Sequence, residues 1–355
     1  VEMVMHFFRF LAQETRELMA AMGGRTMEEL IGGTDLLTPL AGVGEKQAAL
    51  DLSPILYKAK EAESQPEFCQ SERNAPFDQG LKAEEMVKAC LPAIKDGLGG
   101  EFHFTVTNCD RSIGARLSGE IAKVHGNLGM ESKPISLRLT GTVGQSFGVW
   151  NAGGLNMYLE GDANDYVGKG MAGGRLVVYP PRCSSFKSQE AAIMGNTCLY
   201  GATGGKLFAA GRAGERFGVR NSGAIAVVEG IGDNGCEYMT GGIVAVLGPV
   251  GVNFGAGMTG GFAYLMDDGD DLDNRVNAEL VDIMPIEDKA ILAEHLRGLI
   301  NQHYEETGSD HSLSLLTDFA ATLKRFKLIK PKTSDVKNLL GHISRSSAEL
   351  RIQAQ

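Results

Sequence analysis

The chain has 355 residues, 47 of them glycine, and a formal net charge of −10. This acidic balance argues against nucleic acid as a partner, because phosphate contacts need a basic surface. No apolar run approaches the roughly 18 residues of a membrane span. The apolar first ten residues lack a basic head and a small-residue cleavage site, so they do not form a secretory signal. We therefore expect a cytoplasmic protein with no membrane or nucleic-acid partner.

Six cysteines are present, and no two lie within ten residues of each other. This spacing fits neither a zinc site nor an iron–sulfur motif, and it is too sparse for a disulfide scaffold. We expect reduced thiols. The residues are Cys69, Cys90, Cys109, Cys183, Cys198 and Cys236.

A helical pattern opens the chain and predicts a helix that ends at Gly23 and Gly24. Thr26 and Glu29 resemble a capping box, which predicts a second short helix through Ile31. Because Val1 already lies inside the first pattern, we expect further residues before it. The apolar stripe consists of Val4, Phe8, Leu11, Thr15, Leu18 and Met22.

Residues 39–100 carry five scattered prolines and a weak pattern, which indicates an irregular connector with short helices at 45–62 and 82–95. From residue 101 the pattern changes to alternation. It predicts strands at 102–106, 135–139 and 176–179.

An internal repeat follows, in which small residues precede a glycine doublet and a short apolar strand. The six copies are "NAGGLNMYL", "MAGGRLVVY", "ATGGKLFAA", "NSGAIAVVE", "MTGGIVAVL" and "MTGGFAYLM". The second doublet positions are 154, 174, 205, 223, 242 and 261, so the intervals are 20, 31, 18, 19 and 19 residues. The long interval holds "PPRCSSFKSQEAAI", which we interpret as a loop inserted into one repeat. A fixed period near 19 residues marks a solenoid.

The composition of the repeat selects one solenoid type. Leucine-rich repeats need an L-x-x-L-x-L pattern, and helical repeats do not tolerate so much glycine. About 19 residues suit one β-helix coil of three short strands, stacked about 4.8 Å from the next. We thus predict a mainly β fold, a parallel β-helix over 101–268. The residues predicted to point inward are Leu176, Val178, Leu207, Ala209, Ile225, Val227, Val244 and Val246.

The pattern of residues 269–355 predicts a helical extension. One helix is expected to begin at Pro285, with a stripe through Tyr304 and with Gly308 after its end. A second is expected from Ser312 to Phe326, followed by a break at Lys330-Pro331 and a short helix at 333–340.

The motif G-x-G-x-x-G, typical of dinucleotide-binding loops, occurs three times. Such a loop occurs once, follows a strand and opens a helix. Two of the copies here run directly into a glycine doublet and an apolar strand instead. We interpret the glycines as corner residues with φ > 0. The copies begin at Gly168, Gly230 and Gly255.

Other candidate sites are weighed against structural roles. An EF-hand frame from Asp268 places Asp270 at position three and Glu279 at position twelve, but Leu272 and Asp273 occupy positions that need a ligand and a glycine. We interpret this acidic segment as a solvated loop.

Two carboxylate pairs resemble acid–base pairs of polysaccharide-cleaving β-helices, and three arginines recur every four residues. Salt bridges or docking contacts are the preferred interpretation of the arginines. His295 and His303 lie too far apart to share a zinc ion directly. We assign no catalytic, cofactor-binding or metal residue. The pairs are Asp162 with Asp165 and Asp233 with Glu237, and the arginines are Arg212, Arg216 and Arg220.

The glycine repeat as a whole closely resembles the C-terminal domain of the glutamate synthase large subunit. The segments that carry the resemblance include "GTVGQSFGVWNAGG", "GDANDYVGKGMAGG", "AAGRAGERFGVRNSG" and "GVNFGAGMTGG". Residues 1–38 resemble the end of the flavin-binding synthase domain, and "KPKTSDVKNLLGH" resembles the bacterial NADPH-dependent form. A formylmethanofuran dehydrogenase subunit shares the repeat but not the flanking segments.

The resemblance implies a right-handed β-helix and a parent enzyme that makes two L-glutamate from L-glutamine and 2-oxoglutarate. It implies FMN and a 3Fe–4S cluster in the large subunit, and FAD, 4Fe–4S clusters and NADPH at a small subunit. This chain would bind none of them and would hold the glutaminase and synthase domains in place. The alternative is an independent β-helix module that binds a small ligand or sugar.

Overall fold

The computed structural model describes residues 2–40, 42, 44–58, 80–269 and 271–335. The chain divides into two compact units, residues 1–76 and residues 77–355. The first contains the helices α1 (Glu2–Met22), α2 (Glu45–Ala48) and α3 (Ser53–Leu56) and the short 3-10 turn η1 (Thr34–Leu36). The second contains the glycine repeat.

In the first unit, α1 ends as predicted, with Gly23 at a φ of 83°. None of the residues of α1 is buried. The expected helix at 26–31 is wrong, because residues 25–32 form turns. There the Glu29 carboxylate accepts the Arg25 backbone N–H at 2.8 Å. The expected helix at 45–62 is two short helices, and its last four positions lie outside the described residues.

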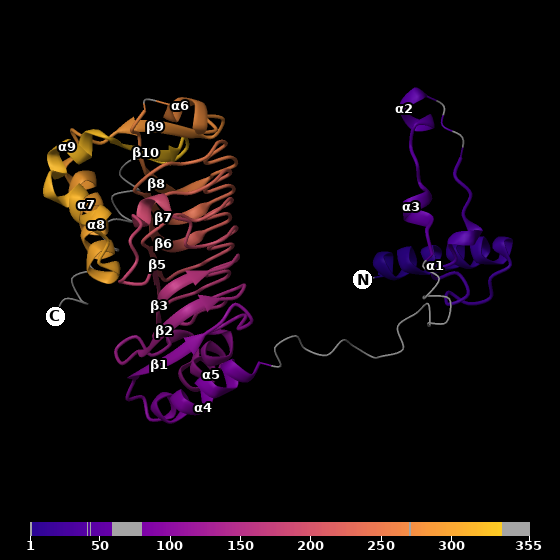
Figure 1. The fold of residues 1–355 in the computed structure, drawn as a ribbon, viewed down its shortest axis with the longest axis horizontal. Helices are drawn as coiled ribbons and strands as arrows, with labels where there is room; N and C mark the ends of the chain where they lie inside the picture. Colours follow the sequence, from indigo (N-terminus) through magenta and orange to yellow (C-terminus); the bar gives the residue numbers. More distant parts are fainter. Residues whose placement is uncertain (1, 41, 43, 59–79, 270, 336–355) are drawn as a thin grey trace. The chain divides into compact units, whose positions relative to one another are not determined.

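The second unit is built on one ten-stranded sheet in the order β1-β2-β3-β4-β5-β6-β7-β8-β10-β9 (Figure 1). Strands β1 to β8 are parallel, and β10 runs antiparallel to both of its neighbours. The parallel solenoid is therefore confirmed. The strands are β1 (Gly100–Val106), β2 (Ile135–Val143), β3 (Leu155–Ala163), β4 (Arg175–Tyr179), β5 (Lys206–Ala209), β6 (Ser222–Val228), β7 (Thr240–Val246), β8 (Gly260–Met266), β9 (Val281–Pro285) and β10 (Phe326–Pro331).

The strand register reproduces the repeat. Ile135 pairs with Leu155, Arg175 with Lys206, and Ile243 with Phe262. Each described coil contributes one strand to the sheet instead of the expected three. The rest of the coil consists of turns and isolated bridges. The long interval is indeed an inserted loop, which includes the short 3-10 turn η4 (Ser188–Glu190).

Helices cover the start and one face of the sheet. Helix α4 (Leu81–Lys95) packs against β1 and against α5 (Ala115–His125), which is followed by η3 (Gly126–Leu128). After the short helix α6 (Leu272–Arg275), α7 (Ala290–Thr307) lies over β4, β5 and β6. It is followed by α8 (Asp310–Thr317) and α9 (Phe319–Lys324), which lie on the same side (Figure 1).

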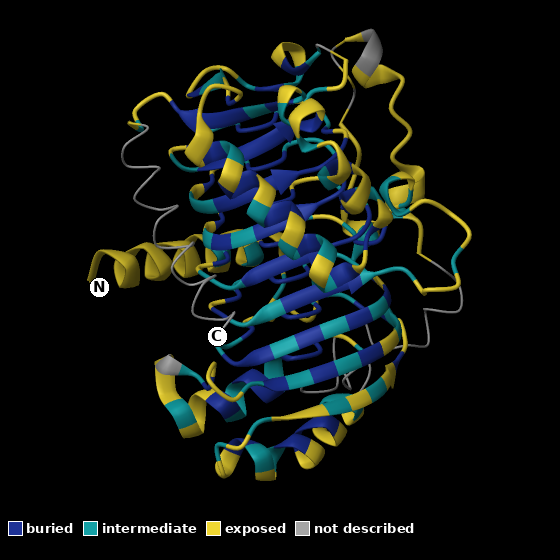
Figure 2. Cartoon of the chain, turned by 90° about the vertical axis from the view of Figure 1, so that its left-hand side faces the viewer, coloured by how far each residue is buried: buried dark blue, intermediate teal, exposed yellow. Residues whose placement is uncertain are grey.

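The strand side chains alternate between two hydrophobic cores, and the sheet is buried on both faces (Figure 2). Leu176 and Val178 point into the coil, whereas Val177 packs under α7. The inward prediction is wrong for Ile225 and Val227, which face α7. Ile225 pairs with Ile243, the residue directly after a doublet, so Ala224 stands in place of the second doublet glycine, one residue later than the predicted count. The other six predicted inward residues are confirmed.

The second glycine of each doublet turns the chain with a left-handed backbone. The φ angles are 70° at Gly174, 87° at Gly205 and 84° at Gly242. A Cβ on Gly174 would overlap the Leu155 carbonyl oxygen of the preceding coil. In the third G-x-G-x-x-G copy, the strand β8 begins at Gly260 where a dinucleotide loop would open a helix. The glycines thus shape corners of stacked coils.

The C-terminal expectations are partly wrong. Pro285 ends β9, and the helix α7 begins at Ala290. Gly308 closes it with a φ of 67°, as predicted. The second helix divides into α8 and α9, and Phe326 starts β10, which continues through Lys330-Pro331. Pairing of β10 between β8 and β9 overrides the local helical pattern. Positions 336–340 of the last expected helix lie outside the described residues.

Under α7, Tyr264 and His295 form a buried polar contact. The Tyr264 hydroxyl lies 3.0 Å from Nδ1 of His295. Burial lowers the pKa of His295 to about 4 and so favours the neutral ring.

We predict that replacing Gly174 by alanine lowers the free energy of unfolding by roughly 2–5 kcal/mol, because it adds left-handed strain and an overlap with the preceding coil. Gly298→Ala is the control, since no atom lies within 4 Å of its added Cβ and it sits in α7. There alanine is expected to stabilise by up to about 1 kcal/mol. Urea unfolding of both variants tests this, and equal midpoints would contradict the corner assignment.

We also predict a pH dependence from His295. Its unfolded ring protonates near pH 6.5 and its folded ring near pH 4, so the unfolded state binds more protons between these values. Stability should fall by about 2–3 kcal/mol as the pH drops from 7 to 4.5. His295→Leu should remove that share of the pH dependence in urea unfolding. A variant with an unchanged pH profile would show that the ring titrates normally.

Candidate functional site

The acidic loop does not assemble a calcium site. Asp268 forms a bidentate pair with Arg325 at 2.6 and 2.8 Å, and Asp271 accepts Nε of Arg275 at 2.9 Å. Asp270 lies outside the described residues. In the part of the chain that the structure describes, no three His, Cys, Asp or Glu side chains gather as metal ligands would.

The two candidate carboxylate pairs join coils. Asp165 accepts the backbone N–H of Asn196 at 2.7 Å, and Asp233 accepts that of Val252 at 2.8 Å. Asp162 accepts the Thr142 hydroxyl at 2.8 Å, one coil earlier. A side chain at Gly195 or Gly251 would overlap the Asp165 or Asp233 carboxylate, respectively. Each of these carboxylates therefore staples its own coil to a neighbouring one.

The three arginines also have separate partners. Arg212 donates to the Gln189 carbonyl of the inserted loop at 2.6 Å. Arg216 pairs with Glu237 at 2.9 Å, and the Arg220 guanidinium lies 5.7 Å from the Tyr238 ring centroid. The sequence period of four does not produce one anion cradle.

The two candidate histidines do not contact each other, and the described cysteines do not form a reactive site. His295 contacts Tyr264, whereas His303 contacts Glu229. Burial raises the pKa of the Cys198 thiol to about 12, which makes it a poor nucleophile. Cys90, Cys109, Cys183, Cys198 and Cys236 are free thiols, and Cys69 lies outside the described residues.

The structure reveals one polar cluster that the sequence reasoning missed. Glu229 is fully buried at the end of β6, on the face that α7 covers. Its carboxylate accepts the Ser188 hydroxyl at 2.6 Å and the Ser309 hydroxyl, and Nε2 of His303 lies 3.3 Å from it. One carboxylate thus joins the sheet, the inserted loop, α7 and the start of α8.

The chemistry of this cluster is structural. Both serine hydroxyls bind the carboxylate directly, and the histidine does not stand between serine and acid as in a nucleophilic triad. Burial opposes ionisation of Glu229, but the contacts from His303, Ser188 and Ser309 outweigh it and lower its pKa. The ionised Glu229 carboxylate therefore stabilises the fold above pH 4.5. This stabilisation is lost as the pH falls through the lowered pKa of Glu229. The signal in the sequence was a lone acid in "AIAVVEG", where the paired coils carry Ala210 and Leu247.

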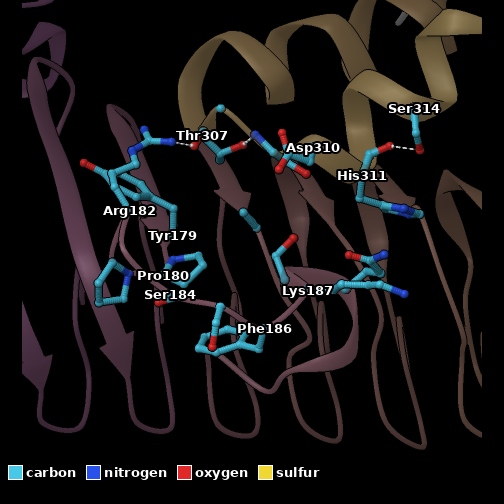
Figure 3. A pocket seen from close by; sticks show the side chains of 17 residues that line it. Tyr179, Pro180, Arg182, Ser184, Phe186, Lys187, Thr307, Asp310, His311 and Ser314 are labelled. Atoms are coloured by element: carbon cyan, nitrogen blue, oxygen red, sulfur yellow. Dashed lines mark hydrogen bonds between the residues drawn. The ribbon is translucent and has the colours of Figure 1, made fainter.

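Beside this cluster, the inserted loop and the α7–α8 junction line an open pocket of about 580 Å³ (Figure 3). Arg182 crosses it and donates to the Thr307 carbonyl at 2.8 Å, and His311 binds the Leu247 carbonyl at 2.7 Å. The first contact holds the inserted loop to α7, and the second holds α8 to Leu247, directly after β7.

We predict that Glu229→Ala lowers the free energy of unfolding by about 3 kcal/mol at pH 7, because the buried His303 and Ser309 and the half-buried Ser188 lose their acceptor. Glu229→Gln keeps the size and one acceptor oxygen and should cost about 1 kcal/mol. Thermal and urea unfolding measure both. A loss below 1 kcal/mol in the alanine variant would show that the cluster does not hold the helices in place.

None of the helices within the described ranges has both the length and the apolar run that crossing a bilayer requires. The GXGXG motif family model matches residues 82–332. The chain is 44% identical over 339 residues to a glutamate synthase (NADH) of Schizosaccharomyces pombe, covering 93% of this chain and 16% of that protein.

Two bacterial relatives extend the match. The glutamate synthase (NADPH) large chain of Azospirillum brasilense is 44% identical over 93% of this chain, and that of Bacillus subtilis is 39% identical over 97%. The match covers 22% of each of these relatives, so the chain spans about a fifth of their length. On the repeat, the solenoid and these matches, the chain belongs to the GXGXG motif family, in the form that glutamate synthase large chains contain.

Proposed function

We propose that this chain is the C-terminal structural domain of a glutamate synthase large subunit. It scaffolds the glutaminase and FMN-containing synthase domains of an enzyme that makes two L-glutamate from L-glutamine and 2-oxoglutarate with NADPH. It contributes no catalytic residue of its own. The observation that carries the proposal is that the candidate carboxylates Asp165 and Asp233 join coils, as the buried Glu229 joins the sheet to the helices.

The solenoid suits this role physically. Ammonia passed between two active sites must not escape, so the sites need a constant mutual geometry. Each coil is held to the next by strand hydrogen bonds, by carboxylate staples and by a continuous apolar interior. Such a rod resists bending and separates its neighbours by a set distance.

Residues 1–38 fit the end of the preceding synthase domain. The apolar side chains of α1 are exposed within the unit of residues 1–76, including Phe7 at 62% and Phe10 at 73%. A helix with such a face is stable when another surface covers it. We assign residues 39–100 to a connector, 101–268 to the β-helix and 269–355 to its C-terminal extension.

The cofactors of the enzyme would be bound by other parts of the enzyme than this chain. The buried thiols Cys198 and Cys236 have raised pKa values and lie on different coils, so they do not fit a cluster ligand set. FMN and the 3Fe–4S cluster would be bound by other domains of the large subunit. FAD, the 4Fe–4S clusters and NADPH would belong to a small partner subunit. We place the enzyme in the cytoplasm.

Removing one coil tests the scaffold role. Residues 243–261 span one repeat, because Ile243 pairs with Phe262. Deleting them from the full-length gene product should shorten the rod by about 4.8 Å and leave Gly242 joined to a strand. We predict that glutamine hydrolysis continues while glutamate formation per glutamine falls and free ammonia appears. Unchanged coupling in a folded variant would contradict the scaffold role.

The purified chain separates this proposal from the independent ligand-binding module. Given glutamine, 2-oxoglutarate and NADPH, it should show no turnover, with the full-length gene product as the positive control. Turnover by the chain alone, or specific binding of a small ligand or sugar, would favour the independent module.

A further inference from the structure

A second corner of each coil carries an unusual row of side chains. Trp150 donates its backbone N–H to the Lys169 carbonyl, Gly170 to Tyr200, and Arg220 to Glu237. These bonds show that Trp150, Gly170, Gly201, Arg220, Tyr238 and Gly257 occupy equivalent positions on successive coils. All six have a left-handed backbone, with φ between 53° and 67°.

Half of these positions are glycine, which adopts this conformation without strain. The other half carry Trp150, Arg220 and Tyr238, whose side chains disfavour it. Glycine occupies this corner in three of the six coils, so the fold itself does not require the large side chains. Other corners also carry non-glycine residues with a left-handed backbone, such as Tyr166 and Asn234, so the exposed rings and not the strain distinguish this row.

The rings lie over the corner glycines. A Cβ on Gly170 would be 2.9 Å from Cδ1 of Trp150, and one on Gly257 would overlap the Tyr238 ring. One face of each ring therefore lies against the next coil. The side chains nonetheless remain 66% exposed at Trp150 and 51% exposed at Tyr238. Exposed Trp and Tyr on a rigid support are the residue types that dominate protein interfaces.

Two cations complete the row. Lys169 lies 5.1 Å from the Tyr166 ring centroid and 5.8 Å from that of Tyr200, and Arg220 lies over Tyr238. Among the described residues, neither cation forms an ion pair with a carboxylate. In a chain of net charge −10, these charges stand out as a local site for an acidic partner. We name Trp150, Lys169, Tyr200, Arg220 and Tyr238 the corner ridge.

We propose that the corner ridge docks a neighbouring domain of the same large subunit, one that presents carboxylates to Lys169 and Arg220 and apolar surface to the rings. The inference rests on the proposed function. The chain spans about a fifth of the length of its relatives, so most of such a subunit lies outside it and supplies the occupant. The ridge spans five successive coils, or about 20 Å, which is enough for a domain contact.

Hydroxyl-radical footprinting compares the ridge in the isolated chain and in the full-length gene product. We expect Trp150, Tyr200 and Tyr238 to oxidise at least five-fold more slowly in the full-length protein. Equal rates would overturn the proposal. Protection at a distant exposed residue such as Phe186, with the ridge still reactive, would also overturn the proposal. It would agree with the scaffold role but place the docking surface elsewhere on the solenoid. Protection nowhere on the solenoid would count against the scaffold as well.

Glycine substitutions separate docking from folding. Trp150→Gly with Tyr238→Gly removes both rings and relieves left-handed strain, so the Tm of the isolated chain should stay equal or rise. In the full-length protein, oxidation of Tyr200 should increase at least three-fold. Thr197→Gly is the control, since Thr197 has a left-handed φ of 58° and lies outside the ridge. It should leave Tyr200 protected.

A clear drop in the Tm of the double variant would make the rings part of the fold and would overturn the docking role. Slow oxidation in the isolated chain at high concentration only would assign the ridge to a second copy of the chain. Protection by an oligosaccharide or a single-stranded nucleic acid, with none in the full-length protein, would also overturn the proposal.

Discussion

The structure depends on how closely the backbone of one coil approaches the next. At the doublet corners, a carbonyl oxygen of the preceding coil occupies the place where a Cβ would lie, as at Gly174 and Gly242. Only glycine allows this approach, and its positive φ turns the chain back into the sheet. Close approach lets parallel strands pair coil after coil. It also leaves the coil interior to apolar side chains such as Leu176, Leu207 and Val244.

The polar side chains follow from the same constraint. Parallel coils leave some backbone N–H groups at their exposed corners without a strand partner. Asp165 and Asp233 accept such groups from the following coil, at places where a glycine makes room for the carboxylate. Glu229 instead accepts side-chain hydroxyls, from Ser188 of the insertion and from Ser309 at the start of α8. Residues that resemble catalytic acids in this way fix one coil to another, as the proposed scaffold role requires.

The sequence predicted the repeat well because period and glycine placement are local signals. The doublets located the corners, and the 31-residue interval located the insertion. Prediction failed where long-range pairing decides the conformation. The single glycine of "NSGA" resembles the second of a doublet, but Ile225 pairs with Ile243, so Ala224 holds that position and Ile225 faces the helices. Pro285 and Phe326 lie in helix-like patterns but enter strands, because β10 pairs between β8 and β9.

The polar clusters were harder to foresee. Glu229, Ser188, His303 and Ser309 are distant in sequence, and only a lone acid after an apolar strand hinted at them. The corner positions of Trp150 and Tyr238 could not be aligned before the coils were stacked, since the insertion shifts the count between them.

We therefore propose that close stacking at glycine corners produces a stiff rod that sets the positions of its neighbours. A single-particle density map of the full-length gene product tests it most directly. The account predicts a solenoid resolved as sharply as the adjoining domains and in one constant orientation to them. A solenoid whose density blurs or takes several orientations while the other domains stay sharp would contradict it.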